Sequence, residues 1–371
     1  MMKKKKRQKD GLYMEDNGPL ILDGGLASEL EAQGAKLQGD PLWSSRLLHT
    51  DPQAIREAHY RFLLGGADVI STATYQASIP GFVKHLDVTP EGARELLMSG
   101  VRLARDTVDR FVSDARPSGR RRPLVAASVG PYGAVLLDGS EYTGAYAERM
   151  SVEDLKAWHR PQIDALAAAG ADLVALETVP SIKEAAALLE LLREFPDTRA
   201  WLSFSCKDGR RISDGSAFAD AARLAASSTA QLVAVGVNCC SPELVEPLLD
   251  SAGSLLGPDL SWVVYPNSGG DWDTEKGWVT SEEQSASILK LSPTWRKQGA
   301  DLIETKYRSP ASLMGDVWNT AREETGNLLG LAPLDPPLRV ADVQVLRVLC
   351  VEVRHHVQPP ERQRRRRRSS S

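Results

Sequence analysis

The chain has 371 residues, 42% of them hydrophobic and 25% charged, which is the composition of an ordinary globular protein with one large or two medium domains. Twelve of its 45 basic residues lie within residues 3–9 and 362–368. The whole chain has a net charge of −4, so the chain without these twelve residues has a net charge of about −16. Such a negative charge argues against binding of nucleic acid by the electrostatic field of the remaining chain. No apolar run approaches the ~20 residues of a membrane span, and four cysteines are too few for a disulfide framework, so we expect a reducing, cytoplasmic setting.

The first elements in chain order are a basic segment, a strand and a helix that leads into a second strand. Residues 1–18 are interpreted as a disordered, basic segment, because a charge run of this kind is most simply a solvated end of the chain. The lysine run is followed by acidic residues and not by the apolar core of a secretory signal, so we expect no cleaved signal. The run "PLILDGGLASE" predicts a strand that ends near Asp23. Asp51 and Pro52 then begin a predicted helix, which ends at Gly65-Gly66 and gives way to the strand-like "DVISTATY".

Apolar runs continue to alternate with helix-length segments, such as residues 181–193 and 242–256, as far as Ile303. Together with the first two strands, they make eight: "PLVAASVGPYGA", "GADLVALETVP", "AWLSFSCKDG", "LVAVGVNCCSP", "SWVVYPNSGG" and "GADLIE". Apolar strands that alternate with helices predict a parallel sheet covered on both faces, and eight such units predict a (β/α)₈ TIM barrel. A doubly wound open sheet is the alternative, but the first strand lacks the three-glycine phosphate-binding spacing that would support it.

The alternation weakens after Ile303. The segment "SLMGDVWNTAREETGNLLGL" predicts one helix, and the proline-containing "APLDPP" leads to a short apolar stretch and an arginine run. We therefore expect a single barrel domain over residues 19–330 and a divergent, Arg-rich tail over residues 331–371.

Polar side chains gather at the predicted strand ends, which form the rim that carries the chemistry of such barrels. Each has a simple structural explanation, since an acid can cap a helix and a buried cysteine is most often a small hydrophobic residue. Together, acids without a lysine or arginine among them suit the ammonium group of an amino acid, and a cysteine thiolate suits a soft metal such as Zn²⁺. The candidates are Asp23, Tyr75, Glu177, Cys206, Asn238, Cys239 and Cys240.

Six ordered motifs between residues 19 and 303 resemble the homocysteine S-methyltransferases. They are "ILDGGLASELEAQG", "GADVISTATYQAS", "ASVGPYGAVLLDGSEYTG", "LETVPSIKEAAALLELL", "VGVNCCSPELV" and "YPNSGGDWD". The resemblance implies a zinc-dependent barrel that moves a methyl group from a sulfonium donor to homocysteine and gives methionine. The "SVGPYGA" and "DGSEYTG" stretches look like the branch that uses S-methylmethionine or S-adenosylmethionine rather than betaine.

The resemblance also implies roles for individual residues. Cys239 corresponds to the first zinc ligand and is the candidate catalytic residue, while Asp23 and Glu177 correspond to the pair that holds the homocysteine ammonium group. Tyr75 and Asn238 are expected to line the same pocket. Zinc coordination would deprotonate the homocysteine thiol, whose pKa is otherwise near ~8.5, and the thiolate would attack the donor methyl in line.

Two further zinc cysteines of the family are missing from this chain. Family members continue from Gly-Ala-Asp-Leu-Ile into Gly-Gly-Cys-Cys, whereas Glu304-Thr305-Lys306-Tyr307 follows here, with Lys306 and Tyr307 at the ligand positions. Possible substitute ligands are Cys240, Cys206 and Glu304. The sequence is thus consistent with three functions. The protein is a methyltransferase, a catalytically impaired barrel that binds homocysteine or another amino acid, or an interaction module that acts through its basic tails.

Overall fold

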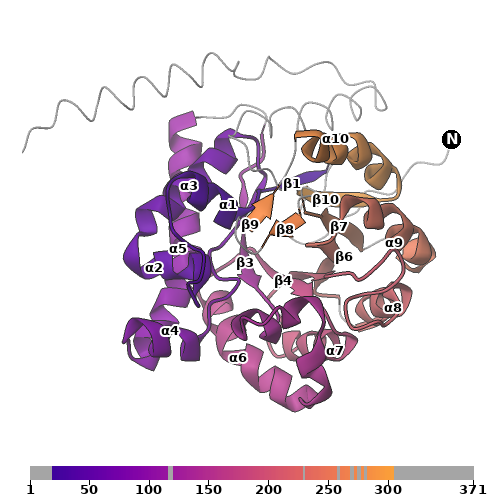
Figure 1. Ribbon diagram of the computed structural model, residues 1–371. Helices are drawn as coiled ribbons and strands as arrows, with labels where there is room; N and C mark the ends of the chain where they lie inside the picture. The colour runs from indigo at the N-terminus through magenta and orange to yellow at the C-terminus, as the bar shows by residue number, and fades with distance from the viewer. Residues whose placement is uncertain are drawn as a thin grey trace, which may run out of the picture. The chain divides into compact units, whose positions relative to one another are not determined.

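A computed structural model describes residues 19–115, 120–228, 230–256, 260–267, 271–273, 277–279 and 282–304 (Figure 1). The predictions of a disordered basic N-terminal segment, a helix after residue 311 and a divergent tail fall outside these residues. Within the described part of the chain, no helix is long and apolar enough to cross a membrane.

Eight parallel strands close into a barrel in the order β1-β10-β7-β6-β5-β4-β3-β2, with helices around them (Figure 1). Closure joins the first strand to the last, because Leu20 pairs with Leu302, while Leu22 pairs with Val69 on the other side. The predicted TIM barrel is therefore confirmed, and the open-sheet alternative is wrong because a closed sheet has no edge. The strands are β1 Leu20–Leu22, β2 Val69–Ser71, β3 Leu124–Val129, β4 Leu173–Val179, β5 Ala200–Phe204, β6 Leu232–Asn238, β7 Ser261–Tyr265 and β10 Ala300–Glu304.

The helices that follow the strands cover the outside of the barrel (Figure 1). The predicted start of α3 is confirmed, because the Asp51 side chain accepts a hydrogen bond from the Ala54 amide at 3.1 Å and Pro52 occupies the first turn. The helices are α1 Leu26–Ala32, α2 Leu47–Thr50, α3 Pro52–Leu64, α4 Ile79–Leu86, α5 Pro90–Ala115, α6 Val152–Ala168, α7 Ile182–Leu192, α8 Phe218–Ser228, α9 Val245–Ala252 and α10 Glu282–Lys297.

The barrel has two apolar layers, one inside the strands and one between the strands and the helices. Leu20 and Leu22 of β1 belong to the inner layer together with Trp201 and Tyr265, whereas Ile21 belongs to the outer layer. This split follows from the two-residue period of a strand, which sends neighbouring side chains to opposite faces. Both faces are buried, so the strands read as continuous apolar runs in the sequence.

Two segments differ from the sequence expectation. Residues 242–256, predicted as one helix, form two short 3₁₀ turns, Pro242–Leu244 and Gly253–Leu255, on either side of α9. Pro247 has no amide hydrogen to bond to the Glu243 carbonyl four residues earlier, so a regular α-helix does not run through from Pro242, and Gly253 follows its last residue. A small antiparallel hairpin of β8 Asp271–Asp273 and β9 Gly277–Val279 follows β7 and was not predicted.

Candidate active site

Two carboxylates lie at the carboxyl ends of the barrel strands, each held by a serine of the neighbouring strand. Asp23 directly follows β1 and is 1% exposed; its Oδ2 accepts from the Ser71 amide at 2.7 Å and its Oδ1 accepts from the Ser71 hydroxyl at 3.0 Å. Glu177 of β4 accepts a hydrogen bond from the Ser128 hydroxyl. The structure thus brings both predicted acids to one rim and fixes the orientation of their oxygens.

Burial makes the Asp23 carboxylate hard to ionise. The pKa of Asp23 is raised from 3.8 to about 7, mainly by desolvation and in smaller part by the nearby Glu177 charge, while the hydrogen bonds from Ser71 act in the opposite direction. No ion pair joins Asp23 to a basic side chain within the described residues. A cation bound between Asp23 and Glu177 would therefore reduce the electrostatic repulsion between the two carboxylates.

Asn238 and Cys239, at the end of β6, are joined to Thr178 at the end of β4. The Asn238 side-chain oxygen accepts from the Thr178 amide at 2.8 Å, and its Nδ2 donates to the Thr178 hydroxyl at 2.7 Å and to the Cys239 sulfur at 3.2 Å. Thr178 Oγ1 lies 3.6 Å from the same sulfur. The fully buried Asn238 therefore fixes the thiol relative to the β4 rim.

Thr178 and Cys239 share an unusual backbone conformation. Their φ angles are +59° and +50°, in the left-handed region that costs a non-glycine residue about 1 kcal/mol or more. Backbone and side-chain hydrogen bonds hold both residues there, including one from the Cys239 amide to the Tyr265 carbonyl at 3.2 Å. Thr178 was not assigned a role from the sequence, since nothing in "LETVP" signals a positive φ angle.

Tyr75 lies beside the thiol on the segment that follows β2. Burial raises the pKa of Tyr75 well above its usual value, and Tyr142, Cys239 and Glu141 are close enough to raise it further. The phenol therefore keeps its proton at neutral pH and acts as a hydrogen-bond donor. Gly130 packs against this residue so closely that a Cβ atom there would lie 2.6 Å from the Tyr75 carbonyl oxygen and 2.8 Å from its ring.

The suggested substitute metal ligands lie in different surroundings. Cys240 is 4% exposed and belongs to the outer apolar layer, against which Cys206 also packs. Burial raises the pKa of the Cys206 thiol, and a hydrogen bond with Cys240 raises it further. Glu304 ends β10 opposite Leu22, and Lys306 and Tyr307 lie outside the described residues.

The described residues do not provide a complete metal site. No group of three or more histidine, cysteine, aspartate or glutamate side chains that could hold a metal ion occurs within them. A catalytic zinc site takes about three protein ligands in tetrahedral positions, and Cys239 supplies one thiol. The described part of the chain therefore supplies one thiol of such a site and not a complete set of ligands.

Comparisons with known proteins agree with the barrel and its rim. The sequence profile described as homocysteine S-methyltransferase matches residues 20–304. The chain is 43% identical over 286 residues to the homocysteine S-methyltransferase of Escherichia coli K12, covering 76% of this chain and 89% of the relative. It is 42% identical over 300 residues to a betaine-homocysteine S-methyltransferase of Drosophila melanogaster, covering 78% and 90%.

A solved structure is similar over most of the chain. The metallated form of the homocysteine methyltransferase MmuM from Escherichia coli superimposes with a TM-score of 0.71 at 38% identity and covers 81% of this chain and 96% of that one. The matched region, residues 20–304, runs from the first described barrel strand to the last. The likeness therefore includes every strand end on which the candidate residues lie.

Proposed function

The chain belongs to the homocysteine S-methyltransferase family, which methylates homocysteine to methionine, and we propose that its methyl donor is a sulfonium compound, S-methylmethionine or S-adenosylmethionine. The observation that carries the proposal is the convergence of Asp23, Glu177 and Cys239 at one rim of a barrel that this family match spans from end to end. The identity of the methyl donor needs its own test, because the Drosophila relative is named for betaine and not for a sulfonium compound.

The acceptor half of the site is assigned to the carboxylates. Asp23 and Glu177 are held by serine donors on neighbouring strands and lie close enough for the Glu177 charge to raise the Asp23 pKa. The ammonium group of homocysteine would bind between them and relieve this repulsion. We expect Tyr75 and Asn238 to line the same pocket, since Asn238 donates a hydrogen bond to the Cys239 sulfur and Cys239 influences the pKa of Tyr75.

Methyl transfer between two sulfur atoms needs little general acid or base catalysis by the protein. A lone pair of the homocysteine sulfur forms the new bond to the methyl carbon while the bond from that carbon to the sulfonium sulfur breaks, and the donor leaves as a neutral thioether. The thiol proton goes to solvent. No general acid is needed, so alignment of the two sulfur atoms and charge complementarity at the rim would supply most of the rate enhancement.

The family and the metallated MmuM structure indicate a metal-dependent enzyme. We propose Zn²⁺ as the metal and Cys239 as its first ligand, since a thiolate is a ligand that zinc prefers. When bound, zinc would supply the homocysteine thiolate at neutral pH. Cys240, Cys206 and Glu304 stay proposed substitutes for the other ligands.

A second candidate function is a barrel that binds homocysteine or a related amino acid with little or no turnover. It is favoured by the sequence at the end of β10, where Glu304-Thr305-Lys306-Tyr307 stands in place of a ligand-bearing segment. Lys306 carries a positive charge that would repel a cation. In this case the acids at the rim would keep their role while the thiol acceptor would not be activated.

The test is methionine formation from homocysteine with S-methylmethionine, S-adenosylmethionine or betaine, with the zinc content of the same sample measured. We expect turnover with a sulfonium donor and none with betaine, and weaker homocysteine binding in Asp23→Asn and Glu177→Gln variants. Turnover with betaine alone would overturn the donor assignment. Homocysteine binding without turnover would establish the second function, and equal binding by all three proteins would remove the ammonium role. The predicted cytoplasmic location stays a prediction.

A further inference from the structure

A fully buried carboxylate, Glu184, lies on α7 outside the rim residues described above. We propose that Glu184 is a positioning residue that fixes the segment of residues 131–150, and that this segment forms the side of the pocket that receives the sulfonium group of the methyl donor. The inference rests on the proposed function for the identity of the donor. The segment connects β3 to α6 and contains the 3₁₀ turns Tyr132–Val135, Ser140–Tyr142 and Ala145–Glu148.

Three donors from two other parts of the chain converge on the Glu184 carboxylate. Its Oε1 accepts from the Tyr132 amide at 2.8 Å and from Nε2 of His159 on α6 at 2.8 Å, and its Oε2 accepts from the Tyr146 hydroxyl. Burial raises the pKa of Tyr146 well above its usual range, and the Glu184 carboxylate raises it further, so the phenol remains a donor. Glu184 thus accepts hydrogen bonds from residues near both ends of the 131–150 segment and from α6.

The segment packs tightly around these contacts. The Tyr132 ring lies 5.3 Å from the Tyr146 ring and 5.0 Å from the Trp158 ring, measured between ring centres. A Cβ atom on Gly133 would lie 2.6 Å from the Glu141 amide nitrogen and from the Tyr146 ring, so only glycine fits between the two turns. A shift of Tyr146 would therefore be transmitted directly to Glu141.

Glu141 and its neighbour Tyr142 connect this packing to the site. The Glu141 carbonyl accepts from the Ser205 hydroxyl at 3.0 Å, and the same hydroxyl lies 3.4 Å from the Thr178 carbonyl at the end of β4. Glu141 and Tyr142 both influence the pKa of Tyr75, which also senses Cys239. The segment therefore reaches the thiol side of the rim.

The chemistry that this segment presents suits a sulfonium cation. Glu141 Oε2 is buried and has no hydrogen-bond partner within the described residues, and burial raises the pKa of this carboxyl group. Tyr142 adjoins Glu141 in the sequence, and both residues are near enough to Tyr75 to raise its pKa. Aromatic faces together with a carboxylate attract a positively charged, poorly hydrated group such as a methylated sulfur.

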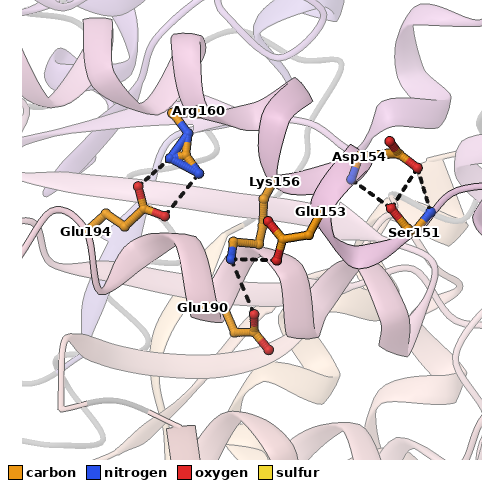
Figure 2. A network of polar contacts seen from close by, with 7 residues as sticks. All are labelled: Ser151, Glu153, Asp154, Lys156, Arg160, Glu190 and Glu194. Carbon is orange, nitrogen blue, oxygen red and sulfur yellow. Dashed lines mark hydrogen bonds and ion pairs between the residues drawn. The ribbon is translucent and has the colours of Figure 1, made fainter.

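The outer surface of α6 and α7 offers a matched control. Figure 2 shows ion pairs on this surface. Lys156 of α6 lies 3.5 Å from Glu190 of α7 and 3.0 Å from Glu153 of its own helix, and Arg160 of α6 forms a two-pronged pair with Glu194, which follows the end of α7. Arg160 and Glu194 are each 42% exposed, so their pair contributes little to stability. Glu194→Gln removes a carboxylate that pairs with α6 just beyond the end of α7, without touching residues 131–150.

The test compares Glu184→Gln, Tyr146→Phe and Glu194→Gln with the unaltered full-length protein. Calorimetry measures the Kd of S-methylmethionine and of homocysteine separately, and amide hydrogen exchange measures the opening of residues 131–150. We expect Glu184→Gln to raise the donor Kd roughly tenfold and to speed exchange in the segment by at least as much, with homocysteine binding changed less than about twofold. Tyr146→Phe should act in the same direction by a smaller factor, and Glu194→Gln should change neither.

The outcomes separate this inference from the proposed function. Equal losses for both ligands, or unchanged exchange in Glu184→Gln, would overturn the positioning role. If the unaltered protein binds homocysteine and no sulfonium compound, the donor assignment fails. Exchange in residues 131–150 would then still decide whether Glu184 fixes the segment.

Discussion

At the residue scale, Asp23 combines deep burial with a carboxylate that has no cationic partner within the described residues. A pKa of about 7 means that, at pH 7, about half of the free protein holds a proton on this group. The proposed ligand ammonium favours the ionised form and lowers the pKa, so binding should release roughly half a proton per site at this pH. L-methionine carries the ammonium group and no thiol, and is therefore the ligand to use.

Calorimetry of L-methionine binding at pH 7 in buffers of different ionisation enthalpy measures this proton release. Asp23→Asn removes the titrating group and should leave a binding enthalpy that no longer depends on the buffer. Proton uptake on binding, or the same release in Asp23→Asn, would contradict the assigned role.

His59 on α3 is a second buried titrating residue and is not one of the rim residues. Both of its ring nitrogens are buried without a partner in the described structure, and desolvation lowers its pKa from 6.5 to about 4. Between these values the unfolded chain binds a proton that the folded chain excludes. Its contribution to the unfolding free energy is therefore fully present above pH 6.5 and is lost as the pH falls toward 4, by about 3 kcal/mol.

Urea unfolding at pH 7.5 and pH 5 of the unaltered protein and of a His59→Leu variant measures this contribution. The variant should lose less stability on acidification, whatever its stability at pH 7.5. His49→Gln changes an exposed histidine and should behave as the unaltered protein does. Equal acid sensitivity in the His59 variant would show that another group controls the decline.

The site residues differ in how far the sequence reveals them. Asp23, Glu177 and Asn238 could be placed because each lies at the end of an apolar run, and parallel strands bring such ends to one rim. Thr178 could not, since its positive φ angle and its contact with the Cys239 sulfur depend on the register between β4 and β6. Glu184 reads as an ordinary helix acid, and only the fold shows that it is fully buried.

At the scale of elements, the eight strands were predictable because both of their faces are apolar. Gly-Ala-Asp occurs three times, directly before β2 and β4 and across the start of β10, which begins at Ala300, and the structure confirms a strand at each place. The β8–β9 hairpin was not predictable in the same way, because three-residue strands are too short to show a period. The break of residues 242–256 into three pieces is visible in hindsight at Pro247 and Gly253.

The turn after β3 gives a prediction at this scale. Gly130→Ala would place a Cβ atom 2.6 Å from the Tyr75 carbonyl oxygen, and because the clash is with backbone, Tyr75 or the β3 end must move. We expect a loss of about 1–3 kcal/mol in stability and weaker binding of homocysteine. Gly139→Ala is the matched change, since its Cβ meets nothing within 4 Å and its φ of +76° costs about 1 kcal/mol.

Thermal unfolding and calorimetry with homocysteine on both variants measure the difference. Gly139→Ala should lose some stability and keep its affinity, whereas Gly130→Ala should lose both. If Gly130→Ala binds homocysteine as the unaltered protein does, Tyr75 does not line the acceptor pocket.

At the scale of the whole molecule, closure of the barrel fixes the position of β10, the strand after which the family carries its paired zinc cysteines. Strand β10 lies between β1 and β7, and Glu304 pairs with Leu22, the residue directly before Asp23. Strand β10 therefore ends at the rim, next to the proposed ammonium site. The register confirms that the third Gly-Ala-Asp copy is the eighth barrel strand, as its sequence predicts.

This register allows the metal site to be tested by restoring the family sequence. Lys306→Cys with Tyr307→Cys should raise the zinc content of the purified protein in part, and adding Glu304→Gly and Thr305→Gly should raise it toward one ion per chain, since glycine lets the backbone bend toward the metal. Methionine formation with S-methylmethionine should rise with zinc content, because the metal supplies the thiolate. Cys239→Ala in the four-residue variant should abolish both. One zinc per chain in the unaltered protein, with turnover equal to that of the four-residue variant, would show that its ligand set is complete without cysteines at 306 and 307. No zinc in the four-residue variant would refute the ligand positions assigned to residues 306 and 307.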